Sequence, residues 1–421
     1  MTADARRAVG ARLPALALIL LVLALAATAT AVRPGLALAA APDVRAPAAI
    51  LVEPATGDVV FQRDARARRP VASTTKLMTA LLTLERAKLG DVLTTTPYRA
   101  APAESVIGLR AGERMTVADL LRGLLLASAN DAAATLAARI GGSRQGFVRI
   151  MNRRARELGL QNTHYANPIG LDQAGNHSSA EDLVKLTLIL RRNEFFRRVT
   201  DAPRATLKSG GHERSIVNRN ALVRNVTAVN GVKTGHTQRA GYVLVGSATR
   251  GGVTVLSAVL GDPTEAARDA DSLALLGYGL SRYHRAMPVR RAESFATAKL
   301  RFRDERVGLV ASRTVRHTVR RGEPIRARVV GAPVEVEGPL PAGARVGTIE
   351  VRWRGRTVER VALITARAVP APSLLQRLGG FVGRTLIVLA VAAVALGSLQ
   401  VMLLRRSHRR RRSQARGTEI A

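Results

Sequence analysis

The chain has 421 residues, of which 47% are hydrophobic, so it is long enough for more than one domain with a sizeable core. It contains no cysteine, which excludes disulfides and thiol chemistry. No two of its seven histidines stand four residues apart, the spacing of a helical zinc site, so a metallopeptidase is not expected.

The two ends of the chain are not globular. Residues 1–41 begin with a basic segment, continue with a long apolar run and end in alanine-rich positions, as a signal peptide does. An uncleaved anchor is the alternative. Residues 385–404 are apolar over about the length that crosses a bilayer, which predicts a transmembrane helix. The arginines of residues 405–421 predict a basic cytoplasmic tail, with a nucleic-acid-binding arm as the alternative.

The part between these ends is therefore expected outside the cytoplasmic membrane. The whole chain has a formal net charge of +34, and residues 42–373 alone carry +23. Such a charge predicts attraction to anionic lipid or acidic wall polymers as partners, in addition to the membrane itself. An arginine-rich composition without a specific partner explains the charge as well. With only 3% aromatic residues, an exported chain is not expected to bind nucleic acid.

The exported part begins with an alternating pattern over residues 48–64 that predicts a β-hairpin. A helix that is apolar on most faces, and hence buried, is predicted from Ser73. Further helices are predicted over residues 116–128, 130–140, 146–160, 179–192 and 264–283, and a three-stranded meander within residues 230–261. This order predicts an α/β (α+β) domain over residues 42–285, with an antiparallel sheet that joins strands from both ends and is flanked by helices.

The texture of the sequence changes after this domain. Residues 286–368 are rich in Val, Arg and Gly and contain short alternating runs, which predicts a small all-β domain at the C-terminal side. Residues 369–384 begin with prolines and are expected to link this domain to the transmembrane helix.

Three short motifs occur in order along the first domain. They are Ser73-x-x-Lys76 at a helix start, Ser128-Ala129-Asn130 between two helices, and Lys233-Thr234-Gly235 on a strand. Singly, each has an ordinary alternative: exposed polar residues on a helix, helix caps, or a strand that runs into a turn. Together they match the motif set of penicillin-binding proteins and class A β-lactamases.

The residue types fit this chemistry. Positions i and i+3 share a helix face, so the Lys76 amine should lie beside the Ser73 hydroxyl. A serine needs a base to take its proton, and a lysine is a base only when its amine is neutral. Burial, the helix dipole and a second cation, Lys233, all lower the pKa of the Lys76 amine. An arginine could not serve, which explains a lysine in a chain whose basic residues are otherwise mostly arginines.

The stretches around these motifs, among them "PVASTTKLMTAL", "LLLASANDAA" and "NGVKTGHTQRAGYVLVGSA", resemble the serine-type D-alanyl-D-alanine carboxypeptidases, low-molecular-mass penicillin-binding proteins with a DD-peptidase/β-lactamase-like fold. The resemblance covers about residues 44–285, and residues 287–368 are similar to the C-terminal β domain of that family. It implies roles for the residues of the three motifs and for two others. Ser73 would be the acylated nucleophile and Lys76 its base. Ser128 and Asn130 would relay protons and hold the substrate amide, and Lys233, Thr234 and Gly235 would form the strand that binds the substrate carboxylate. The backbone N–H groups of His236 and Ser73 would form an oxyanion hole, and Arg268 would be a second ligand of the carboxylate.

The resemblance further implies the reaction. The terminal D-Ala of a peptidoglycan stem peptide would leave through an acyl-serine intermediate, β-lactams would acylate the same serine, and no cofactor or metal would be needed. A DD-endopeptidase acting on cross-links uses the same motifs. A β-lactamase would need a glutamate between the second and third motifs; the stretch "NTHYANPIGLD" contains none, and Glu181 lies in a predicted helix beside an apolar face. A non-catalytic wall-binding protein is the remaining alternative.

Overall fold

The computed structural model describes residues 40–417. The predicted signal peptide lies almost wholly outside the described residues, as does the end of the basic tail. The chain divides into two compact units. The first holds most of residues 40–282 and carries the three motifs, so it is called the catalytic unit below, and the second holds the chain from Tyr283 onward.

A five-stranded sheet of order β2-β1-β9-β8-β7 organises the catalytic unit. Its strands are β1 (Ala48–Glu53), β2 (Asp58–Arg63), β7 (Val229–Thr237), β8 (Gly241–Arg250) and β9 (Val253–Asp262). β1 pairs with β9 in antiparallel register, with Ala48 opposite Leu260. The first hairpin of the unit thus adjoins the last strand of the meander, which confirms the prediction that the sheet joins strands from both ends.

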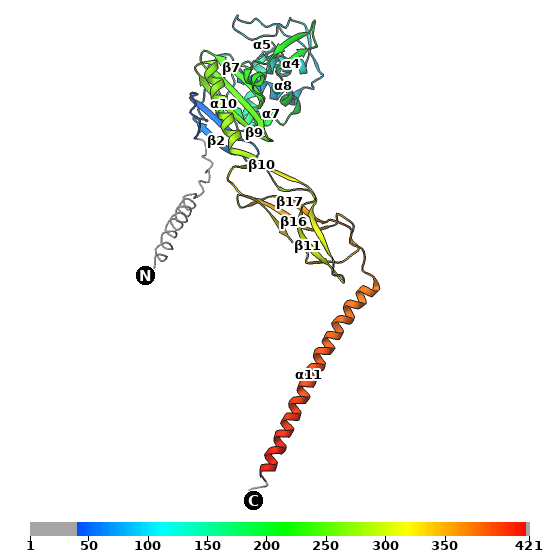
Figure 1. The fold of residues 1–421 in the computed structure, drawn as a ribbon. Coiled ribbons are helices and arrows are strands. Elements are labelled where there is room, and N and C mark those ends of the chain that lie inside the picture. Colours follow the sequence, from blue (N-terminus) through cyan, green and yellow to red (C-terminus); the bar gives the residue numbers. More distant parts are fainter. Residues whose placement is uncertain (1–39, 418–421) are drawn as a thin grey trace, which may run out of the picture. The chain divides into compact units, whose positions relative to one another are not determined.

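Both faces of this sheet are covered. Successive side chains of a strand point to opposite faces, so consecutive buried residues show that each face is packed. On one face, Val243 and Val245 of β8 belong to the large core that the helices also form. Leu244 between them is buried as well. Leu244 and Gly246 point to the opposite face from Val243 and Val245. On that face Gly246 approaches Leu276 of α10 (Glu265–Arg282), the helix that lies alongside the sheet in Figure 1.

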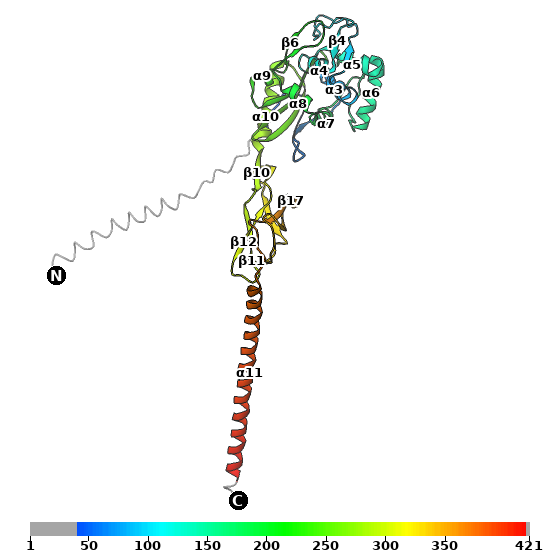
Figure 2. The same cartoon turned by 90° about the vertical axis from the view of Figure 1, so that its right-hand side faces the viewer.

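A group of further helices is seen together in Figure 2. They are α3 (Lys76–Arg86), α4 (Val117–Leu125), α5 (Asn130–Gly141), α6 (Arg144–Glu157) and α7 (Ala180–Leu190). Helix α3 is fully buried from Lys76 to Thr83 and is packed against α4, α5 and α7, as its apolar sequence predicts. These helices confirm the predicted ones, except that the segment from Ser73 begins as a 3-10 turn, Ala72–Thr75, before α3.

Several short elements of the catalytic unit were not predicted. They are β3 (Val92–Thr94) and β4 (Arg114–Thr116), which pair with each other, β5 (Arg204–Leu207) and β6 (Arg214–Val217), which also pair, and the helices α8 (Glu194–Asp201) and α9 (Ala221–Asn225). Strands of three or four residues contain too few positions for an alternating pattern to stand out.

The second unit contains the predicted small β domain. Six strands form a sheet of order β14-β16-β17-β12-β11-β15, and β10 pairs with β13. The strands are β10 (Tyr283–Val289), β11 (Ser294–Leu300), β12 (Arg306–Ala311), β13 (Val315–Arg320), β14 (Ile325–Val330), β15 (Glu335–Val336), β16 (Arg345–Trp353) and β17 (Arg356–Thr365). A separate core of aliphatic side chains, including Leu309, Ile349 and Leu363, holds them together.

The described chain ends in one long helix, α11 (Leu374–Gly417). Within it, Leu386–Arg406 is long and apolar enough to cross a membrane. The helix begins ahead of this segment, so residues 374–384 of the predicted linker are helical. Pro370 and Pro372 stand just before its start, and no proline follows to interrupt it.

Candidate active site

The nucleophile candidate Ser73 lies in a tight turn that leads into α3. Ala72, the residue before it, has φ +47°, a left-handed conformation that is strained for a residue with a Cβ. Ser73 is the second residue of the 3-10 turn Ala72–Thr75, whose end is continuous with α3. Strain of this kind persists only where the surrounding structure imposes it, and here it orients the serine at the start of the buried helix.

The Lys76 amine lies directly beside Ser73. Its Nζ is 2.8 Å from Ser73 Oγ and donates to the backbone oxygen of Ile169 at 2.6 Å. The residue is fully buried. Burial, followed by the charge of Lys233, holds the pKa of the Lys76 amine well below its usual range. The neutral amine that a lysine base requires is therefore favoured.

Two glycines allow the chain to pack tightly around this turn. A Cβ on Gly235 of β7 would stand 3.0 Å from the backbone nitrogen of Ser73. Gly170 has φ +94°, and a Cβ there would stand 2.0 Å from the backbone oxygen of Ala72. Any side chain at either position would push against the turn. Gly235 thus allows β7 to pack against the turn because it has no side chain. Gly170, which was not predicted as a site residue, allows the segment between α6 and α7 to do the same.

The second motif occupies the connection between α4 and α5. Ser128 has φ +60°, another left-handed residue with a Cβ. The N-cap of α5 is Ala129, and no side chain caps it, so neither Ser128 nor Asn130 is an ordinary helix cap. Asn130 is buried, and its Nδ2 donates to Glu104 Oε2 at 2.7 Å.

The third motif lies within β7, not at its end, since the strand continues to Thr237. Lys233 is 1% exposed and donates to the backbone oxygen of Thr234 at 2.8 Å. Burial, aided by the charges of Arg219 and Arg268, lowers the pKa of the Lys233 amine to about 7. Arg219 was not predicted. It donates to the Ala127 backbone oxygen at 3.1 Å and also lowers the pKa of the Lys76 amine.

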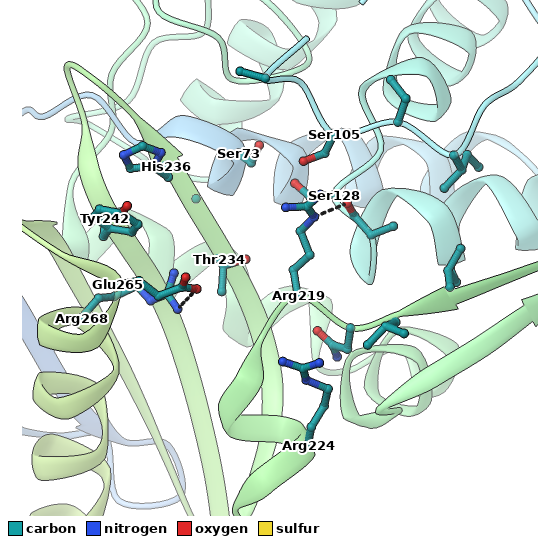
Figure 3. A pocket seen from close by; sticks show the side chains of 18 of the residues that line it. Ser73, Ser105, Ser128, Arg219, Arg224, Thr234, His236, Tyr242, Glu265 and Arg268 are labelled. Carbon is teal, nitrogen blue, oxygen red and sulfur yellow. Dashed lines mark hydrogen bonds and ion pairs between the residues drawn. The ribbon is translucent and has the colours of Figure 1, made fainter.

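A cavity of about 940 Å³ opens over this arrangement (Figure 3). Six of the nine predicted site residues line it: Ser73, Ser128, Thr234, Gly235, His236 and Arg268. The other three, Lys76, Asn130 and Lys233, are buried close to those that line the cavity. The structure thus assembles all nine predicted residues into one region of the catalytic unit, although they are spread over almost 200 positions of sequence.

The side of the cavity formed by β7, β8 and α10 is rich in cations and aromatic rings. His236 is stacked on Tyr242 with ring centroids 4.0 Å apart. Arg268 forms ion pairs with Glu265 and Asp269 and lies over the Tyr242 ring. It is only 2% exposed, so it is not the solvated helix residue that was its alternative interpretation. Arg219 and Arg224 add two more guanidinium groups to the cavity.

Some groups of this site could not be predicted from the sequence. Glu104, Arg219 and Arg224 belong to segments without a recognised spacing, and the Ile169 carbonyl is a backbone group that any residue could supply. Tertiary structure brings them to the motifs. Gly170 is the exception, since the glycine in "NPIGLD" was visible, but nothing in the sequence showed what it approaches.

A serine beside a buried lysine amine, in a cleft between an antiparallel sheet and a helical group, defines the class of serine acyl-enzymes whose base is a lysine. Comparison with known proteins narrows the class. Residues 36–264 match the peptidase family S11 of D-alanyl-D-alanine carboxypeptidases.

Curated relatives agree with this match. The chain is 33% identical to D-alanyl-D-alanine carboxypeptidase DacA of Escherichia coli K12, over 78% of this chain and 85% of that protein. It is 31% identical to DacF of Bacillus subtilis, over 74% and 83%. Among solved structures, penicillin binding protein 5 of Haemophilus influenzae is similar with a TM-score of 0.57 and 28% identity, over 78% of this chain and 98% of that chain. This chain belongs to the D-alanyl-D-alanine carboxypeptidases, the penicillin-binding serine peptidases of family S11.

Proposed function

We propose that this protein removes the terminal D-Ala from peptidoglycan stem peptides by a serine-lysine mechanism centred on Ser73 and Lys76. The observation that carries the proposal is the 2.8 Å separation of Lys76 Nζ and Ser73 Oγ, with the amine buried beside a second cation. The neutral amine takes the hydroxyl proton while Ser73 Oγ attacks the carbonyl of the penultimate residue. The terminal D-Ala leaves with a proton, and water then hydrolyses the acyl-serine.

The remaining site residues have roles in binding and proton transfer. Ser128 and Asn130 relay the proton and hold the substrate amide. Thr234 and Arg268 line the cavity and bind the terminal carboxylate, while the positive charge of the buried Lys233 amine attracts it. The backbone N–H groups of Ser73 and His236 receive the developing oxyanion. A β-lactam ring presents a carbonyl and a carboxylate in similar places and acylates the same serine.

We further propose that the catalytic unit functions outside the cytoplasmic membrane, held by residues 386–406 of α11 as a single-pass anchor. The arginines that follow the anchor support a cytoplasmic position for its C-terminal side, because segments rich in Arg and Lys tend to stay in the cytoplasm. In this arrangement we keep the domain boundaries proposed from sequence, 42–285 for the catalytic domain and 286–368 for the β domain. We also propose that the cationic exported part is attracted to anionic lipid or acidic wall polymers.

Two enzymatic alternatives differ in how far the structure supports them. A class A β-lactamase would need a glutamate from between the second and third motifs beside the acyl-serine. Glu181 is paired with Arg66 and Lys185, and none of the four glutamates between these motifs lines the cavity. A DD-endopeptidase shares the proposed site, so it is distinguished by substrate and not by geometry.

The proposal is tested with purified full-length protein in detergent. Fluorescent penicillin should label the protein at Ser73, and a synthetic pentapeptide that ends in D-Ala-D-Ala should release D-alanine, while Ser73→Ala should do neither. Labelling without D-alanine release, combined with cleavage of cross-linked dimers, would replace the carboxypeptidase by the endopeptidase. Rapid turnover of the penicillin would instead indicate a β-lactamase.

A further inference from the structure

One carboxylate close to the catalytic motifs is not explained by the proposed mechanism. Glu104 lies in the segment between β3 and β4 and accepts hydrogen bonds from the Tyr98 hydroxyl, from the Ala101 N–H at 3.1 Å and from Asn130 Nδ2 at 2.7 Å. These bonds outweigh partial burial and hold the pKa of Glu104 below its usual range, so the group is an anion at neutral pH. Glu104 does not line the cavity, although its neighbours Ala103 and Ser105 do (Figure 3 labels Ser105).

The charge state of Glu104 determines how the Asn130 amide is turned. An ionised carboxylate can only accept hydrogen bonds, so the end of the amide that faces it must be the NH₂ group. The amide oxygen then points elsewhere. Asn130 Oδ1 is buried, and among the described residues it has no hydrogen-bond partner. A buried acceptor without a partner is costly, unless a donor arrives during the reaction.

The segment that carries Glu104 is fixed to the start of α5 at several points. The Asn130 N–H donates to the Ser105 backbone oxygen at 2.7 Å. Two further N–H groups of the segment, those of Ile107 and Leu109, donate to the Asp131 carboxylate. Glu104 is therefore held against Asn130 by a rigid loop, and its contact is not that of a freely rotating surface side chain.

We propose that Glu104 is a positioning residue of the proposed reaction: it fixes the Asn130 amide in the orientation that leaves Oδ1 as the acceptor without a partner. Glu104 touches neither the substrate nor Ser73, and it acts through Asn130. The inference rests on the proposed function, because it assigns Asn130 the task of holding the substrate amide.

The charge of Glu104 also acts on the base. Four charged groups influence the Lys76 amine from the elements around it: Lys233 and Arg219 lower its pKa, and Glu104 and Asp131 raise it. Replacing Glu104 by a neutral residue removes one of the two acidic influences, so the pKa of the amine falls. Because the neutral amine is the active form, the rise of acylation rate with pH then moves to lower pH.

The first test compares Glu104→Gln with the wild type in the full-length protein. Glutamine has the same shape but can donate as well as accept, so the Asn130 amide is no longer held in one orientation. The rate of labelling by fluorescent penicillin at pH 8 should fall roughly tenfold or more, as expected for the loss of one charge-assisted hydrogen bond. The rising limb of the pH profile should move to lower pH while the Tm stays close to that of the wild type.

Glu157→Gln is the matched control, since Glu157 is a half-exposed carboxylate paired with Arg154 on α6. It should change neither rate nor pH profile. Glu104→Gln with wild-type rate and profile would overturn the inference, provided that the wild type is labelled. An unlabelled wild type would refute the proposed function instead, so the two failures are distinguishable.

A double-mutant cycle decides whether Glu104 acts through Asn130. The loss caused by Glu104→Ala should disappear in the Asn130→Ala background, because the residue to be positioned is then absent. Full additivity would overturn the proposal. Should either Glu104 variant fail to fold, Tyr98→Phe removes one of the bonds that hold the carboxylate without removing its charge. It should lower the labelling rate severalfold with an unchanged pH limb, and an unchanged rate would count against the inference.

Discussion

Charge is distributed differently in the catalytic unit and in the C-terminal β domain. In the catalytic unit Lys76, Lys233 and Arg268 are each no more than 2% exposed, and they belong to the proposed site around Ser73. In the β domain the core is aliphatic, and charged side chains such as Arg313 and Lys299 form pairs at the surface, about half exposed. A buried cation changes the proton affinity of its neighbours, whereas water screens an exposed one. The identity of a basic residue should therefore matter in the first unit and hardly in the second.

The largest effect is expected for Lys76→Arg. The arginine side chain cannot lose its proton in a protein, so Ser73 would have no base. Acylation by fluorescent penicillin should fall by at least the roughly 10²–10⁴-fold that general-base catalysis contributes. Lys88→Arg is the control, since Lys88 is exposed just beyond α3, and it should label like the wild type. Labelling of Lys76→Arg at the wild-type rate, with an unchanged Tm, would exclude Lys76 as the base.

Gly235→Ala should have the next largest effect, because it moves the serine without changing a charge. The added Cβ would stand 3.0 Å from the Ser73 nitrogen and from the Ala72 Cβ. The turn would have to shift by a few tenths of an ångström. Since a misplacement of about 1 Å at the reacting group can cost about 10²-fold, the labelling rate should fall severalfold. Gly277→Ala in α10 is the matched control, because nothing lies within 4 Å of its Cβ position. If both variants keep the wild-type labelling rate, tight packing against the turn is not what positions Ser73.

Much of the catalytic unit could be predicted because its signals are local. The hairpin, α4 to α7 and α10 follow from periodicity, and the order of strands and helices indicated the mixed fold. The three motifs were recognisable because the members of each stand within three residues of one another and because they occur in the order typical of one known motif set. Spacing on a helix also predicted the Ser73–Lys76 contact.

The parts that escaped prediction depend on distant contacts. Glu104 meets Asn130 only because the segment between β3 and β4 folds back on α5, and no short spacing encodes that. Arg219 acts on Lys233 through space, in a chain where arginine is too common to attract notice. The left-handed conformations of Ala72 and Ser128 carry no sequence signal either, because glycine, the usual marker of positive φ, is absent from both positions.

Lys233→Met should reveal the stability cost of a buried cation. Below pH 7 the amine is charged in both the folded and unfolded states, and its burial is unfavourable. Between its folded pKa of about 7 and its ordinary value of 10.5, the unfolded chain binds a proton that the folded protein lacks, so wild-type stability rises with pH. The variant should be more stable by roughly 1–3 kcal/mol at pH 6, and this advantage should shrink toward pH 10.

Chemical denaturation at pH 6, 8 and 10 measures this difference in free energy of unfolding. Lys185→Met, on the exposed side of α7 where the amine is paired with Glu181, is the control and should show no comparable gain. An advantage of Lys233→Met that is constant or grows with pH would contradict a depressed pKa for the folded amine.

The smallest effect is expected for Lys299→Arg, which is the same exchange as Lys76→Arg made in the β domain. Lys299 Nζ lies 3.4 Å from Asp304, and both side chains are at least half exposed. Water solvates either cation there, and arginine can form the same pair, so the free energy of unfolding should change by no more than about 0.5 kcal/mol. Penicillin labelling should be unchanged, since no step of the proposed reaction uses this charge. A substantial loss of labelling would show that surface charge in the β domain affects the site, and the contrast between the two units would then not hold. If Lys76→Arg and Lys299→Arg both leave labelling and stability unchanged, the contrast also fails, because burial would then have no bearing on which basic residue the chain requires.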